Sequence, residues 1–220
     1  MLVLAVDTAT PALTVGLARL TDTVEMLAAR VQVDARRHAE LLTPAISAVL
    51  AQAGRIPADL GAVVAGVGPG PFTGLRVGLA TAAAFADAIG IPMYGVCSLD
   101  AVPVGPGPTL VATDARRREV YWATYTGGRR AAGPEVERPQ DLAPRLPELG
   151  VTAMAGAGAV LYAEVLGLPL LDSPYPTAEA LVRLAADRIR AGAPTEQLTP
   201  LYLRRPDVTM AAGPKSVTPV

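Results

Sequence analysis

A glycine- and proline-rich loop, set between an apolar run and a long helical segment, constrains this chain more than any other feature. The apolar run covers 62–65, and the helical segment ends near Gly90. The loop between them is built around Gly68, Pro69, Gly70, Pro71 and Gly74. A strand, a glycine-rich loop and a helix can together hold an anion at the helix N-terminus. This loop is not a Walker A sequence, because no lysine follows its glycines, and it is not a GxGxxG fingerprint, because Pro71 and Phe72 follow Gly70.

The helix after the loop carries small residues at regular spacing. Thr73 is expected to be its N-cap and Gly90 its C′ residue, just past the end of the helix. Gly74, Gly78 and Ala82 are four residues apart and form a smooth strip along one side. Such a strip lets another element approach closely. Two interpretations stay open: packing against the chain's own sheet, or a helix–helix interface with another chain.

Composition limits the classes of protein to which the chain can belong. Its 220 residues suit one large domain or two small ones, and 51% hydrophobic with 18% charged residues allow a sizeable core. A net charge of −1 disfavours binding to nucleic acid by bulk electrostatics. Cys97 is the only cysteine and His38 the only histidine, so an internal disulfide and a multi-histidine metal site are excluded. No signal peptide and no membrane-spanning run are expected, so the predicted location is the cytoplasm.

The first half of the chain reads as an α/β unit. Three strands are expected at 2–6, 13–20 and 24–33, followed by a helix over 36–53. A strand at 62–66, the helix after the glycine-rich loop and a strand at 91–96 come next. This order matches the ribonuclease H-like topology. Pro44 either kinks the first helix or starts a helix that Thr43 caps. Asp7 ends the first strand, where it either contacts a metal or phosphate or shapes the turn by accepting backbone N–H groups.

A linker rich in proline and glycine at 104–108 separates a second unit. The predicted division is an N-terminal lobe over 1–104, a smaller C-terminal lobe over 105–205 and a disordered tail over 206–220. In the second unit a strand ends at Asp114 and is followed by a charged turn and a strand at 120–125, which weakly echoes the arrangement around Asp7. An amphipathic helix is expected over 177–190.

Six sequence blocks resemble the TsaB (YeaZ) family, and they follow one another along the whole chain. They are VDTATPALTVGL at 6–17, RRHAELLTPAISAVL at 36–50, GVGPGPFTGLRVGLATA at 66–82, YGVCSLDAV at 94–102, DARRREVYWATY at 114–125 and PLYLR at 200–204. The resemblance implies an α/β protein with the actin/Hsp70-like ATPase fold, in which two ribonuclease H-like lobes have mixed sheets flanked by helices.

The resemblance also implies a function. Members of the family are the non-catalytic dimerisation subunit for the synthesis of threonylcarbamoyladenosine next to the anticodon of tRNA. The expected partners are a TsaD-like transferase and a TsaE-like ATPase, with a second copy of the chain as a further possibility. ATP and a metal are expected in those partner subunits, and no cofactor or metal in this chain alone. A TsaD-like metal site uses an HxxxH pair, which a chain whose only histidine is His38 cannot supply.

Two groups of site residues follow from the resemblance. A partner interface is expected on the two N-terminal helices, at His38, Leu41, Leu42, Ala45, Gly74, Gly78, Ala82 and Phe85. A degenerate phosphate or nucleotide region, without the usual turn glycine, is expected at Asp7, Thr8, Thr10, Asp114, Gly156 and Gly158. No catalytic residue is assigned.

Two other functions compete with the scaffold. The first is a self-sufficient ATPase, kinase or metallopeptidase-like enzyme, with Mg²⁺ and a nucleotide held by Asp7, Asp114 and Glu119. The second is an RNA-binding module. It would use the arginines at 116–118 and 129–130 and the aromatic residues Tyr121, Trp122 and Tyr125, unless those aromatic residues pack the core of the second lobe.

Overall fold

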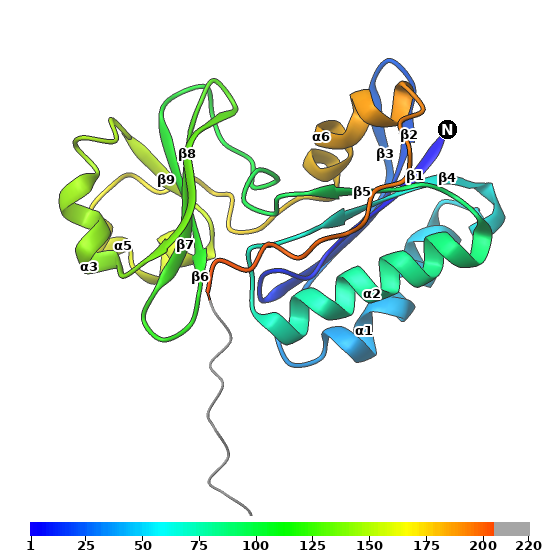
Figure 1. Cartoon of the computed structure of the whole chain (residues 1–220), viewed down its shortest axis with the longest axis horizontal. Coiled ribbons are helices and arrows are strands. Elements are labelled where there is room, and N and C mark those ends of the chain that lie inside the picture. The colour runs from blue at the N-terminus through cyan, green and yellow to red at the C-terminus, as the bar shows by residue number, and fades with distance from the viewer. Residues whose placement is uncertain (205–220) are drawn as a thin grey trace, which may run out of the picture.

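The computed structural model describes residues 1–204, and these form two lobes that lie side by side (Figure 1). The predicted tail over 206–220 lies outside the described residues. The first lobe is built on a five-stranded sheet with the order β3-β2-β1-β4-β5. Its strands are β1 (Leu2–Asp7), β2 (Ala12–Leu20), β3 (Val24–Val33), β4 (Leu60–Gly66) and β5 (Met93–Val96).

Strand pairing gives this sheet the expected ribonuclease H-like topology. β1 pairs antiparallel with β2 and parallel with β4, β2 pairs antiparallel with β3, and β4 pairs parallel with β5. Alternate residues of β1 face opposite sides, as the period of a strand requires. Leu4 and Val6 join the core under helices α1 (His38–Gln52) and α2 (Phe72–Ile89), whereas Val3 and Ala5 join the core under helix α6 (Ala178–Arg190).

The second lobe repeats the strand order of the first. Its four-stranded sheet has the order β8-β7-β6-β9, built from β6 (Thr109–Asp114), β7 (Val120–Thr126), β8 (Arg129–Glu137) and β9 (Ala153–Ala155). A single parallel bridge between Met154 and Leu170 occupies the position that β5 has in the first sheet. The echo between the two halves is therefore confirmed, although the sequence did not predict β8.

Short helices complete the described chain. The second lobe holds α3 (Pro139–Leu142), α4 (Ala157–Leu161), α5 (Ala163–Leu166) and the 3₁₀ turn η2 (Ala143–Arg145), and the first lobe holds the 3₁₀ turn η1 (Pro57–Asp59).

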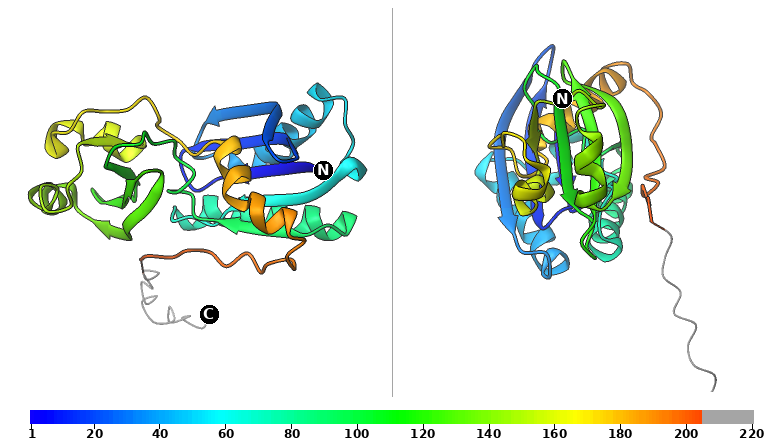
Figure 2. Two further views of the ribbon diagram at one scale, coloured as in Figure 1. Left: turned by 90° about the horizontal axis from the view of Figure 1, so that it is seen from above. Right: turned by 90° about the vertical axis from the view of Figure 1, so that its left-hand side faces the viewer.

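Helix α6 corrects the predicted lobe boundaries. It packs on the first sheet, where Leu181 and Val182 share a core with Val3 and Ala5, so 105–205 is not one separate lobe (Figure 2). Without α6 this face of the first sheet would be exposed apolar surface. Burial of that surface favours the packing of α6 on the first sheet, to which the chain returns after the second lobe. The segment after α6 then runs back along β5, where the Glu196 N–H donates to the Met93 carbonyl.

One apolar cluster joins the two lobes. Leu99 and Val102, which follow β5, pack against Val111 and Tyr121 of the second sheet. The Asp100 carboxylate accepts hydrogen bonds from the Tyr125 hydroxyl at 2.7 Å and from the Arg130 guanidinium, so it bridges the lobes as well. The lobes are therefore held together by buried contacts as well as by the linker.

The ends of the first two helices differ in part from the predictions. α1 is continuous through Pro44, so a new helix starting there is the wrong alternative. α2 begins at Phe72 with Pro71 as its N-cap, so Thr73 is not the cap, while Gly90 ends the helix in the left-handed region at φ 70° as expected. By length and composition alone α2 could span a membrane, contrary to expectation, but one side of it is buried on the first sheet.

Candidate functional site

Helices α1 and α2 lie side by side on one face of the first sheet, and their inner sides are buried (Figure 1). Four of the predicted interface residues belong to this inner side: Leu42, Ala45, Gly78 and Ala82. These four pack within the chain's own core and present no surface to a second chain. Their assignment to an exposed interface is therefore wrong, because sequence spacing gave the strip but not the side toward which it faces.

Buried Gly78 of α2 and Gly70 of the preceding loop allow the turn between β1 and β2 to approach closely. A Cβ atom added at Gly78 would lie 2.2 Å from the Thr8 Oγ1 atom, and one added at Gly70 would lie 2.2 Å from the Ala9 carbonyl oxygen. The Thr8 hydroxyl donates a 2.8 Å hydrogen bond to the Gly74 carbonyl. For this strip, packing within the chain is the correct one of the two interpretations.

The middle of the outer sides of α1 and α2 forms an uncharged surface, which we call the helix face, and the exposed residues Glu40, Arg76 and Asp87 bound it at its ends. It consists of exposed or half-buried residues, namely Leu41, Thr43, Pro44, Ser47, Ala48 and Ala51 of α1, with Val77, Ala80, Thr81, Ala84, Phe85 and Ala88 of α2. No ionisable residue occurs in α2 between Arg76 and Asp87. A helix side in water normally carries charges, and a broad uncharged side is typical of an interaction surface.

Sequence reasoning missed most of this face. Of the predicted interface residues, Leu41 and Phe85 belong to it and Gly74 is half-buried nearby, whereas Ala80, Ala84 and Ala88 are not among the predicted residues. Small residues occur on every side of α2, so their spacing cannot show which side is outward. The absence of charge over almost three turns of α2 was the available signal.

His38 lies inside the molecule, at the start of α1, and not on the helix face. Its side chain is 4% exposed, and its Nε2 atom lies 3.3 Å from the Pro11 carbonyl oxygen. Its Nδ1 atom is buried and has no hydrogen-bond partner among residues 1–204. A Cβ atom added at Gly74 would lie 3.1 Å from this nitrogen.

A cavity of about 170 Å³ lies where the two lobes meet, and His38 is part of its wall. Its lining residues come from the β1–β2 turn, the starts of α1 and α2, and the β6–β7 turn: Thr8, Thr10, Pro11, Ala35, His38, Pro71, Phe72, Thr73, Gly74 and Arg116. The described lining thus brings Thr8 and Thr10 of the predicted phosphate region together with an arginine of the second lobe. It contains no carboxylate.

Asp7 lines neither this cavity nor any surface, because it is buried beneath the glycine-rich loop. Its Oδ1 atom accepts the Ala9 N–H at 2.9 Å, and its Oδ2 atom accepts the Ser98 hydroxyl at 2.5 Å. Burial raises the pKa of Asp7 to about 6, although its hydrogen bonds to Ser98 and to the Ala9 N–H act in the opposite direction. The alternative in which Asp7 shapes the turn is therefore confirmed.

The remaining residues of the predicted nucleotide region lie in the second lobe. Asp114 lines a second cavity, of about 260 Å³, together with Pro11, three residues of α4 and the later residues Pro174 and Tyr175. Gly156 has φ +95°, and an added Cβ atom would lie 2.2 Å from the Ala112 carbonyl oxygen. At Gly158 an added Cβ atom would lie 2.7 Å from the Thr113 carbonyl carbon. The two glycines therefore let α4 pack closely on β6 and do not form an open cradle.

The basic turn and its aromatic neighbours do not form a stacking platform. Tyr121, Trp122 and Tyr125 are at most 7% exposed and pack in the core of the second lobe, as the structural alternative expected. Arg130 is paired with Asp100. Within residues 1–204 no group of three or more histidine, cysteine, aspartate or glutamate side chains is placed to hold a metal ion.

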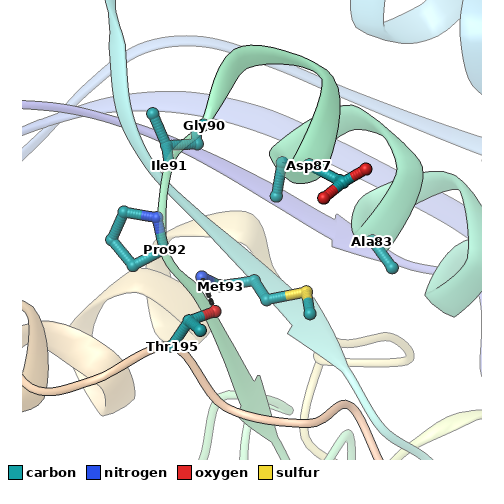
Figure 3. Close-up of a pocket in the computed structure, with 8 residues that line it drawn as sticks. Ala83, Asp87, Gly90, Ile91, Pro92, Met93 and Thr195 are labelled. Atoms are coloured by element: carbon teal, nitrogen blue, oxygen red, sulfur yellow. Dashed lines mark hydrogen bonds between the residues drawn. The ribbon is translucent and has the colours of Figure 1, made fainter.

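A third, open cavity of about 340 Å³ lies beyond the C-terminal end of the helix face (Figure 3). Ala83 and Asp87 of α2 line it together with Met93 and Thr195, whose hydroxyl accepts the Met93 N–H at 3.1 Å. This hydrogen bond holds the segment after α6 against the edge strand β5. That segment therefore forms the wall of the cavity opposite α2.

Comparison with known proteins gives one consistent family. A profile of the family described as "TsaD: tRNA N6-adenosine threonylcarbamoyltransferase" matches residues 29–207. An uncharacterized protein of Mycobacterium tuberculosis is 53% identical over 206 residues, which are 93% of this chain and 92% of that protein. The Escherichia coli "tRNA threonylcarbamoyladenosine biosynthesis protein TsaB" is 33% identical over 223 residues, covering 93% of this chain and 95% of that protein.

A solved structure agrees with these sequence matches. YeaZ from Pseudomonas aeruginosa superposes with a TM-score of 0.76 at 30% identity, over 92% of this chain and 99% of that one. The chain therefore belongs to the TsaB (YeaZ) family, within the wider group that the TsaD profile describes, and it has the actin/Hsp70-like ATPase fold with two ribonuclease H-like lobes.

Proposed function

We propose that this chain acts in the synthesis of threonylcarbamoyladenosine in tRNA as a non-catalytic scaffold that binds a TsaD-like transferase through its helix face. The TsaB relatives are named for this biosynthesis, and their family includes this chain. The transferase and a TsaE-like ATPase supply the ATP and the metal, tRNA is the substrate of the complex, and the complex works in the cytoplasm.

The helix face is the observation that carries this proposal. It joins two helices into one surface whose centre is uncharged and whose ends carry Glu40, Arg76 and Asp87. Small side chains such as Ala80, Ala84 and Ser47 at its centre let another helix approach closely. Phe85 and Leu41 at its margins are half-buried apolar residues that a partner can cover. A second copy of the chain presents the same surface, so a homodimer would use this face when the partner is absent.

The region of Asp7 supports a scaffold more than a self-sufficient enzyme. Both carboxylate oxygens of Asp7 are already bonded inside the chain, and the Thr10 hydroxyl bonds to Ala12 within the same turn. Polar groups that satisfy one another in this way are not free to bind Mg²⁺ or a phosphate without a rearrangement.

Size-exclusion chromatography with light scattering tests the proposal, on the chain alone and mixed with the TsaD-like protein of the same organism. The wild-type chain should form a heterodimer. The substitution Ala84→Arg places a charge on the helix face. We expect it to raise the dissociation constant of the heterodimer at least tenfold, a loss of about 1.4 kcal/mol in binding free energy. Ala84 is exposed, so the variant should fold.

Ala191→Arg is the matched control. Ala191 is also exposed, and it lies at the end of α6, on the opposite side of the sheet. This control should bind the partner like the wild type. Equal binding by Ala84→Arg and the wild type would contradict the helix-face model, and nucleotide hydrolysis by the chain alone would favour the enzyme alternative.

A further inference from the structure

The cavity of about 170 Å³ between the lobes has a lining suited to a small anion. We propose that it binds one small oxyanion, a phosphate or carboxylate group, between the start of α2, the His38 ring and the Arg116 guanidinium. The site is separate from the helix face, and it does not depend on the proposed partner.

His38 gives the strongest indication of a ligand. Its Nε2 atom faces the Pro11 carbonyl oxygen, which can only accept, so Nε2 carries a hydrogen. Nδ1 is then the nitrogen without a partner, in a side chain that is 4% exposed. A buried polar atom without a partner is costly. With Nε2 carrying the hydrogen, Nδ1 can accept a hydrogen bond from the O–H of a hydrogen phosphate, and this would satisfy both nitrogens of the ring.

The start of α2 supplies a second set of donors. The first N–H groups of a helix have no partner within the helix, and no side chain among residues 1–204 caps this one. Phe72, Thr73 and Gly74 all line the cavity. The helix is 18 residues long, so its dipole also favours negative charge at this end.

Arg116 brings a positive charge from the other lobe. Its guanidinium forms an ion pair with the Asp114 carboxylate at 3.7 Å, which is longer than a direct hydrogen bond, and its side chain is 56% exposed. Arg116 itself lines the cavity and Asp114 does not, so an anion there would compete with Asp114 for the exposed guanidinium. A charge-assisted hydrogen bond from arginine is among the stronger polar contacts in proteins.

The cavity size and the neighbouring turn limit what can bind. Pockets for drug-sized ligands begin at about 300 Å³, so this cavity admits a single phosphate or carboxylate group but no whole nucleotide. The β1–β2 turn offers no further donors at Ala9 and Ala12, because their N–H groups already bond to Asp7 and Thr10. The site therefore differs from a turn-based phosphate site.

Nuclear magnetic resonance of the full chain tests the proposal, with chloride replaced by phosphate at constant ionic strength. We expect saturable shifts of the Phe72, Thr73 and Gly74 amides, together with a change in the His38 Nδ1 resonance as this nitrogen gains a hydrogen-bond partner. A parallel titration with acetate distinguishes the two ligand sources. Shifts with phosphate alone assign the site to phosphoryl groups, and shifts with both assign it to oxyanions in general.

Arg116→Ala should weaken phosphate binding about tenfold, the usual loss for one charge-assisted hydrogen bond. Arg118→Ala is the matched control, because Arg118 lies in the same turn, has a similar φ of 64° and does not line the cavity. It should change the affinity less than twofold. The proposal is overturned if these amides do not shift with either anion, or if Arg118→Ala weakens binding as much as Arg116→Ala.

Discussion

The Asp7 carboxylate accepts a 2.5 Å hydrogen bond from the hydroxyl of Ser98, which lies 91 residues further along the chain. The same hydroxyl oxygen accepts the Gly68 N–H at 3.1 Å. Asp7 ends β1, Gly68 follows β4 and Ser98 follows β5, so one buried network joins the ends of three neighbouring strands. This network holds the glycine-rich loop at the start of α2.

The buried position of Asp7 predicts a stability that depends on pH. Its pKa is raised from 3.8 to about 6, so the folded state holds this proton more tightly than the unfolded state. As the pH rises from about 4 to about 6, the wild type should lose about 3 kcal/mol of unfolding free energy relative to Asp7→Asn. Above that range the difference should be constant.

Urea unfolding of both proteins from pH 4 to pH 8 measures this difference directly. Other titrating groups contribute equally to the two proteins and cancel when the curves are subtracted. A difference in unfolding free energy that stays the same across the whole range would contradict the raised pKa of Asp7.

Removal of the Ser98 hydroxyl should be costly. Ser98→Ala leaves both the Asp7 Oδ2 atom and the Gly68 N–H without a partner in a buried place, which predicts a loss of about 2–4 kcal/mol in unfolding free energy. Because the Ser98 hydrogen bond lowers the pKa of Asp7, its loss should raise that pKa further. Ser47→Ala, on the exposed side of α1, should change the unfolding free energy by less than about 0.5 kcal/mol.

The contact between Gly78 and Thr8 predicts coupled substitutions. Gly78→Ala places a methyl group 2.2 Å from the Thr8 Oγ1 atom and should destabilise the fold by about 2–3 kcal/mol. Thr8→Ala removes that oxygen and should rescue part of the loss, so the double variant is more stable than the sum of the two single changes. Thermal unfolding of all four proteins measures the coupling.

Gly105→Ala is the control for this cycle, since nothing lies within 4 Å of the Cβ position there. It should leave the unfolding midpoint almost unchanged. Strict additivity of Gly78→Ala and Thr8→Ala would show that the two residues do not contact each other.

Cys97 should be unreactive in the folded chain. Burial, helped by the nearby Asp100 carboxylate, raises the pKa of its thiol from 9.0 to about 11. The thiolate is the reactive form, so at pH 8 a disulfide reagent should react about a hundredfold more slowly than it does with the unfolded chain. If the reagent reacts with Cys97 at equal rates in the folded chain and in the chain unfolded by guanidinium, the predicted protection of Cys97 is wrong.

Much of the first lobe could be predicted because its strands are apolar and its turns are marked by polar residues. The strand at 24–33 has the predicted bounds, and the amphipathic pattern gives α6 to within one residue. The edge strand β8 could not be predicted from pattern, because Arg129–Glu137 is mostly exposed and includes a glycine and a proline. Its pairing with β7 gives it strand structure, and this pairing is a long-range property of the sheet.

The candidate site was predicted less well than the fold. The residues of α2 that face inward are determined by the β1–β2 turn, whose Thr8 bonds to Gly74, 66 residues away. Helical spacing alone cannot detect such a contact when small residues occupy every side. The unpartnered nitrogen of His38 is equally invisible in sequence, because it depends on how Pro11 and Gly74 surround the ring.

The return of α6 to the first sheet has a consequence for the growing chain on the ribosome. Val3, Ala5 and their neighbours are synthesised early, but the helix that covers them comes only at 178–190, after every strand of the second sheet has been made. At about 5–20 residues per second, this side of the sheet stays uncovered for roughly 10 to 35 seconds. Because α6 emerges after the second sheet is complete, the lobe that begins first is the last to finish folding.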